Sequence, residues 1–97
     1  MKLGQKASTE HMVLYLNQKS NTATPRFGFV VGKTVGNAVQ RNLVKRRARA
    51  ACYARISQFS PSSDLVLRAL PGLASVTWDQ FTNELDSALS RLMGEKA

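Results

Sequence analysis

The sequence predicts an α+β fold, in which helices pack on a single small sheet of three to four strands. Three short apolar segments, at 12–16, 27–32 and 65–70, lie between turn-rich stretches and have the length of strands. Two longer segments, from 38 to about 56 and from 77 onward, repeat apolar residues with the period of a helix. The chain has 97 residues, 43% of them hydrophobic, which suits one domain with a small core.

The expected strands differ in character. Segment 12–16 is a continuous apolar run, and the turn-rich connection that follows it ends at Pro25. Segment 27–32 alternates, so that it offers one face to the core and one that a ligand backbone could approach at its glycines. The first face consists of Phe27, Phe29 and Val31, and the second of Gly28, Val30 and Gly32. Segment 65–70 ends at Pro71 and Gly72.

The helix between the second and third strands is expected to be amphipathic. Asn37 is a suitable N-cap, and neither proline nor glycine follows it up to residue 56. Arg47 breaks the pattern because it falls within the apolar arc, close to Leu43. The apolar arc comprises Val39, Leu43, Val44, Ala50, Ala51 and Ala54, and the opposite arc comprises Arg41, Asn42, Lys45, Arg49 and Arg55.

The last helix is expected to begin after Thr77, with Gln80 completing a capping box. Its buried stripe is predicted to consist of Trp78, Phe81, Leu85, Leu89 and Leu92. The order of elements is therefore strand, strand, helix, strand, helix.

The distribution of charge predicts a polyanionic partner. The formal net charge is +8, and the eight cations from Arg26 to Arg55 are accompanied by no acidic residue. No carboxylate occurs between Glu10 and Asp64, whereas an ordinary soluble surface intersperses both signs. Nucleic acid is the partner that such a segment favours over a merely solvated face.

The composition also predicts where the protein works. The single cysteine excludes an internal disulfide framework, and no Cys and His spacing matches a structural zinc site. No apolar stretch approaches the roughly 18 residues of a membrane span, and no secretory signal is recognisable. We therefore expect a soluble protein of the reducing cytoplasm, with no metal site of its own.

Motifs that could support catalysis by the protein alone are weak. The run Gly32-Lys33-Thr34 resembles the end of a phosphate-binding loop, but Phe27 occupies the position of the required first glycine. His11 is the only imidazole, and Cys52 has no second histidine to serve as its base. We expect no catalytic side chain in the polypeptide.

A row of cations is the most informative feature of the central helix. Arg41, Lys45 and Arg49 recur every four residues, so they form one row that can follow a phosphate backbone, with Asn42 beside it. Tyr15 and Phe29 are aromatic residues that could stack on unpaired bases.

The segments 26–33 (RFGFVVGK) and 35–46 (VGNAVQRNLVKR) closely resemble the signature of the bacterial ribonuclease P protein subunit. The resemblance extends from Val13 to the last helix. It implies a protein that binds the catalytic RNA and the single-stranded 5′ leader of precursor tRNA, while the RNA, with Mg²⁺, cleaves the precursor. It also implies a fold like domain 2 of ribosomal protein S5, with a left-handed β-α-β crossover, and no need for a protein oligomer.

The resemblance also assigns residues. Tyr15 and Phe29 would belong to the leader cleft. The RNA-binding set would be Arg26, Lys33, Asn37, Arg41, Asn42, Lys45, Arg46, Arg47 and Arg49.

The sequence departs from the family pattern in three respects, one of which is that Thr34 and Val30 stand where many members have a second lysine and a serine. Leu43 stands where the family has a second arginine, and Arg47, one turn further on, is the suggested replacement. Residues 1–97 are expected to form a single RNA-binding domain that lacks the usual N-terminal helix.

Two other functions stay open at this point. A structural RNA-binding protein of the ribosomal type would have the same charge distribution. An RNA-independent nuclease would need His11 or a carboxylate as its catalytic group.

Overall fold

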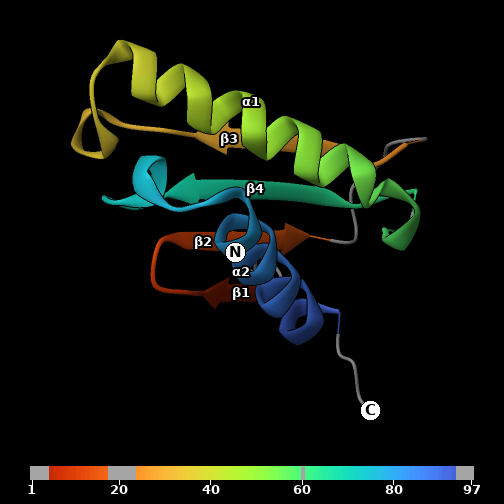
Figure 1. Cartoon of the computed structure of the whole chain (residues 1–97). Coiled ribbons are helices and arrows are strands. Elements are labelled where there is room, and N and C mark those ends of the chain that lie inside the picture. Colours follow the sequence, from red (N-terminus) through yellow and green to blue (C-terminus); the bar gives the residue numbers. More distant parts are fainter. Residues whose placement is uncertain (1–4, 18–23, 60, 94–97) are drawn as a thin grey trace.

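The computed structural model, described here for residues 5–17, 24–59 and 61–93, contains one four-stranded sheet with two helices (Figure 1). The predicted α+β fold is confirmed. The strands are β1 (Gln5–Ser8), β2 (Met12–Asn17), β3 (Arg26–Val30) and β4 (Asp64–Ala69). The helices are α1 (Ala38–Ala54) and α2 (Trp78–Leu92), and three single 3₁₀ turns are η1 (Lys33–Val35), η2 (Ile56–Gln58) and η3 (Leu73–Ser75).

The sheet has the strand order β1-β2-β4-β3. β2 pairs antiparallel with β1 and with β4, whereas β3 pairs parallel with β4. Parallel neighbours need a long connection, and α1 supplies it between β3 and β4. β1 was not predicted, because its sequence, QKAS, holds a single apolar residue and gives no alternating pattern.

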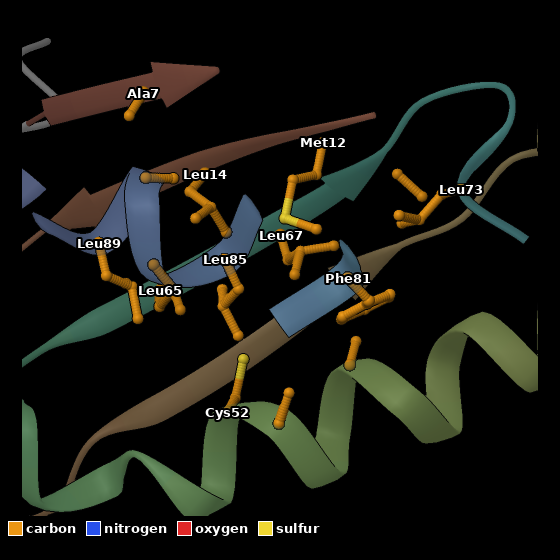
Figure 2. Packing of buried hydrophobic residues seen from close by; sticks show 14 of the residues in the cluster. Ala7, Met12, Leu14, Cys52, Leu65, Leu67, Leu73, Phe81, Leu85 and Leu89 are labelled. Atoms are coloured by element: carbon orange, nitrogen blue, oxygen red, sulfur yellow. The ribbon is translucent and has the colours of Figure 1, made fainter. Parts of the chain in front are cut away.

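Both helices pack on one face of the sheet and enclose the core. α1 runs alongside β3 and β4, and α2 crosses β1 and β2 (Figure 1). Along β2 the side chains are alternately buried and half-buried, so that Met12 and Leu14 enter the core and Tyr15 lies on the other face. Figure 2 shows Met12, Leu14, Leu67 and Phe81 in this core.

The opposite face of the sheet, called here the open face, consists of partly or fully exposed side chains. The register across three strands places Tyr15 opposite Val66, and Val66 opposite Gly28. The open face comprises Lys6, Ser8, Val13, Tyr15, Asn17, Arg26, Gly28, Val30, Asp64, Val66 and Arg68.

The buried side of α1 is rotated from the predicted arc. Val39, expected in the core, is 76% exposed, and Ala50 and Ala54 are also exposed. Arg55, expected on the outer face, is 16% exposed and pairs with Asp86 of α2. The side chains that α1 buries are Val44, Ala48, Ala51 and Cys52. Alanines on both sides of α1 make its apolar arc ambiguous, so packing against the sheet and α2 decides the rotation.

The start of α2 differs from its prediction in two details. Thr77 accepts a hydrogen bond from the Gln80 N–H, as expected, but the Gln80 side chain donates to Glu84 instead of closing a capping box. Trp78, expected in the buried stripe, is 44% exposed, although its ring stacks on that of buried Phe81. The rest of the predicted stripe is buried.

The start of α1 depends on a full capping box and on Gly36. Asn37 Oδ1 accepts from the Gln40 N–H, and Gln40 Oε1 accepts from the Asn37 N–H, each at 2.9 Å. Gly36 has a φ of 157°, and a Cβ there would collide with the Gln40 side chain that forms this box.

We therefore expect Gly36→Ala to lower the free energy of unfolding by about 1–3 kcal/mol, since it combines backbone strain with loss of a cap. Urea unfolding followed by circular dichroism measures the change. Gly32→Ala is the matched control, because a Cβ at Gly32 meets nothing within 4 Å. Equal effects at both glycines would contradict the role given to Gly36.

Candidate RNA-binding surface

Contacts on both sides of α1 fix which residues it presents to solvent. Towards β3, the Arg49 guanidinium lies 5.9 Å from the centre of the Phe29 ring. Towards η3, Arg47 Nη1 donates to the Val76 carbonyl oxygen at 2.9 Å. These contacts leave the surface between the two sides free for a ligand.

That surface, called here the basic face, is formed by η1 and the outer side of α1. Arg41, Lys45 and Arg49 follow one another at about 6 Å along the helix axis. Asn42, Lys45, Arg46 and Arg49 are exposed, and Arg41 is half-buried. The basic face comprises Lys33, Arg41, Asn42, Lys45, Arg46 and Arg49.

The cations of the basic face have no carboxylate partner among residues 5–17, 24–59 and 61–93. Two other arginines do have one. Arg26 Nε lies 2.9 Å from Asp64 Oδ1, and Arg55 pairs with Asp86. In both pairs the hydrogen bond to the aspartate raises the pKa of the arginine. The positive charge of the basic face is therefore available to a partner, whereas these two arginines hold protein elements together.

The structure does not bring the whole predicted RNA-binding set together. Arg26 lies on the open face at the start of β3, paired across the sheet with Asp64. Arg47 lies on the side of α1 that faces η3, partly buried and bonded to Val76, so it does not join the row formed by Arg41, Lys45 and Arg49. Asn37 is exposed, but its side chain serves the capping box. The other six predicted residues form the basic face.

The two aromatic residues predicted for one leader cleft lie on opposite faces of the sheet. Phe29 pairs in register with buried Leu67 and lies beneath α1, whereas Tyr15 belongs to the open face. The structure therefore does not bring these two side chains into one cleft. The β3 residue in register with Tyr15 is Gly28, and Phe29, one position further along the strand, lies on the opposite face.

The open face carries a hollow beside Tyr15. A pocket of about 320 Å³ is lined by Tyr15, Asn17, Asp64 and Val66, and a second of about 380 Å³ extends from Val66 to Gly28 and Arg26. Lys6 is the β1 neighbour of Tyr15, and Arg68 lies between Val13 and Val30. Sequence reasoning missed Lys6 and Arg68, although the alternation of Arg68 with the apolar residues of its strand could have shown its face.

A separate cluster joins the turn between β1 and β2 to α2. Glu84 accepts hydrogen bonds from the Thr9 hydroxyl at 2.7 Å and from the His11 N–H at 3.0 Å. His11 Nδ1 lies 2.6 Å from the same carboxylate, and Nδ1 carries the proton because an ionised carboxylate only accepts. Burial would raise the pKa of Glu84, but these hydrogen bonds outweigh it and hold the pKa below the ordinary 4.5. His11 thus has a structural role, because it links the β1–β2 turn to α2 through Glu84.

This cluster predicts loss of stability in acid. A carboxylate with a lowered pKa in the folded state contributes stability that is complete above its unfolded value of 4.5 and is lost as the pH falls. We expect Glu84→Gln to lower the free energy of unfolding by about 1–3 kcal/mol at pH 7 and by less near pH 3. Denaturant unfolding at both pH values measures this. Glu10→Gln, at a side chain that is 78% exposed, is the control and should change little.

The thiol of Cys52 is enclosed in the core. Cys52 is fully buried on the inner side of α1, and burial raises the pKa of its thiol to about 12, which keeps it protonated at neutral pH. The cysteine is therefore a packing residue.

The family model described as Ribonuclease P matches residues 1–93 of the chain. The chain belongs to this family. Among its ribonuclease P relatives, the protein component of Pseudarthrobacter chlorophenolicus is 40% identical over 94 residues, which cover 97% of this chain and 69% of the relative. The protein component of Clavibacter michiganensis is 38% identical over 88 residues, covering 91% and 78%.

Solved ribonuclease P proteins share the fold. The Staphylococcus aureus protein superposes with a TM-score of 0.77 at 27% identity, over 91% of this chain and 80% of that one. The Thermotoga maritima protein superposes with a TM-score of 0.79 at 23% identity, over 94% and 86%.

Membership of the ribonuclease P family makes the chain the protein component of an endoribonuclease holoenzyme, whose partner is ribonuclease P RNA. The alternative of a ribosomal-type structural protein is not favoured. In the part of the chain that the structure describes, no helix has the length and apolar character to cross a bilayer.

Proposed function

We propose that this ribonuclease P protein binds the catalytic RNA through its basic face and the 5′ leader of precursor tRNA through the open face of its sheet. The RNA then breaks the phosphodiester bond, and maturation of the tRNA 5′ end takes place in the cytoplasm. The observation that carries the proposal is the contrast between the unpaired cations of the basic face and the paired Arg26 and Arg55.

The basic face suits the catalytic RNA. Binding of each phosphate by a lysine or arginine releases counterions, and the gain is largest where the cation has no carboxylate to give up. Arg41 and Arg49 offer planar guanidinium groups that donate hydrogen bonds to two phosphate oxygens at once, whereas Lys45 contributes a point charge. Arg46, one position from Lys45, extends this field outward.

The open face suits a single strand. Tyr15 offers a half-exposed ring beside a hollow, with Lys6 as its cross-strand neighbour. Arg68 adds a cation in the next row of the sheet. An aromatic ring flanked by cations supports stacking of an unpaired base together with neutralisation of its phosphates.

Cleavage is assigned to the RNA because the basic face does not fit a metal site. Mg²⁺ prefers carboxylate, carbonyl and phosphate oxygens. The basic face consists of five cations and one amide, which would repel the ion, so RNA phosphates are the groups that hold Mg²⁺ in this proposal. One protein copy per RNA suffices, since each face is built within one chain.

Reconstitution with a bacterial ribonuclease P RNA tests the proposal. We expect the protein to accelerate cleavage of precursor tRNA at low Mg²⁺, and the acceleration to shrink when the leader is shortened. The polypeptide without RNA should cleave nothing, which also tests an RNA-independent nuclease. A reconstituted complex that cleaves no faster than the RNA alone would contradict the proposal.

A further inference from the structure

Tyr53 continues the row of cations on α1. It follows Arg49 by four residues, as Arg49 follows Lys45, and therefore lies one turn further along the same side of the helix. Its side chain is 52% exposed, which makes it one of the few large apolar residues at the described surface. The mechanism proposed above gives this ring no role.

The ring of Tyr53 is held from below by a chain of aromatic contacts. Its centre lies 5.0 Å from that of Phe27, with the two planes at 87°. Phe27 in turn lies 5.2 Å from Phe59, which is buried. This support limits the motion of the ring without covering it, so that little entropy is lost when a flat ligand packs against it.

The surroundings of Tyr53 favour an anionic partner with flat groups. The sequence has no acidic residue between Glu10 and Asp64, and Arg49 lies one turn away. Asp86, which reaches the end of α1 from α2, is paired with Arg55. An RNA strand whose phosphates follow the row formed by Arg41, Lys45 and Arg49 would reach this ring with its next nucleotides. An acidic protein segment would satisfy the cations but would give the ring no preferred partner.

We propose that Tyr53 is a stacking platform for an unpaired nucleobase of an RNA bound on the basic face. The inference rests on the proposed function and adds a neutral, base-directed contact at the end of the cationic row. The nucleotide belongs either to the catalytic RNA or to the precursor leader, and the experiment separates these sources.

Tyr53→Leu keeps an apolar side chain on Phe27 but removes the ring that stacks. We expect roughly tenfold weaker RNA binding, within the range measured for base–aromatic stacking, with an unchanged dependence on salt because no charge is lost. Tyr53→Phe should retain full affinity. Trp78→Leu, which removes an exposed aromatic residue of α2, is the matched control and should leave affinity unchanged.

A fluorescence measurement detects stacking directly. Trp78 is the only tryptophan, so Tyr53→Trp combined with Trp78→Phe places the sole indole at the proposed platform. We expect its emission to be quenched on addition of RNA. Quenching by the catalytic RNA alone assigns the base to that RNA, and quenching only by precursor with a leader assigns it to the leader.

Unchanged affinity of Tyr53→Leu would overturn the inference, and so would unchanged emission with both RNAs. The melting temperature of each variant is measured in parallel, and a platform role requires that Tyr53→Leu lose affinity while it is fully folded. The proposed function is tested separately by charge variants of the basic face. If these lose affinity and Tyr53→Leu does not, only the stacking platform is rejected.

Discussion

Replacement of Arg41, Lys45 and Arg49 together by glutamine should lower the affinity for ribonuclease P RNA by roughly 100-fold or more at low salt, since hydrogen bonds to charged groups contribute about 1.5–3 kcal/mol each. None of the three forms an ion pair with a described carboxylate, so the folded protein should lose little stability. Each lost phosphate contact should also reduce the slope of log affinity against log salt by about 0.7 to 0.9. The triple variant is therefore expected to lose about 2.1 to 2.7 units of slope, measured by filter binding over a salt series.

Arg91→Gln is the matched control for a single member of the row. Arg91 is an exposed cation of α2 and donates to the backbone oxygen of Ser8. Arg91→Gln therefore changes the net charge by the same amount as Arg49→Gln, but at a residue of another helix. We expect a smaller change of slope for Arg91→Gln than for Arg49→Gln. Equal slopes for the two variants would show that net charge alone, rather than the basic face, governs binding.

Phe81→Ala should be the most destabilising single substitution in the core. Phe81 is fully buried and stacks on Trp78 with the ring centres 5.9 Å apart. Its removal leaves a cavity in the core, to which Leu67 and Met12 also belong (Figure 2), and such losses cost about 3–5 kcal/mol. Because small domains are stable by only about 5–15 kcal/mol, a large part of the variant is expected to unfold on mild heating.

Thermal unfolding by circular dichroism measures this effect, with Trp78→Ala as the control at the other ring of the pair. Trp78 is 44% exposed, so its truncation should cost clearly less. Addition of ribonuclease P RNA should raise the melting temperature of Phe81→Ala, since a ligand that binds only the folded state stabilises it. A variant that melts like the wild type would contradict the placement of Phe81 at the centre of the core.

Local patterns predicted most of the fold. Strands β2, β3 and β4 follow from short apolar or alternating segments, and the Asn37 cap with a run free of proline and glycine fixes the start of α1. β1 was not predicted, because the segment QKAS forms a strand only through its pairing with β2. Pairing between two segments cannot be read from the local pattern of either one.

The candidate site was predictable only in part, for the same reason. The spacing of Arg41, Lys45 and Arg49 is local, and the structure keeps these residues together. By contrast, the hydrogen-bond partner of Arg55 is Asp86, 31 positions away in the sequence. The partner of Arg47 is Val76, 29 positions away. The separation of Tyr15 from Phe29 depends on the register between β2, β4 and β3, which no single segment encodes.

The position of β3 at the border of the sheet bears on self-association. Among the strands of the described chain, β3 is bonded to β4 alone, so its outer backbone groups could template the addition of a strand from another molecule. The helix beside this border carries Lys45 and Arg49, and two copies meeting edge to edge would bring like charges together. Electrostatic repulsion thus opposes fibril growth through the exposed edge of β3. This protection weakens wherever polyanions neutralise the cations of α1.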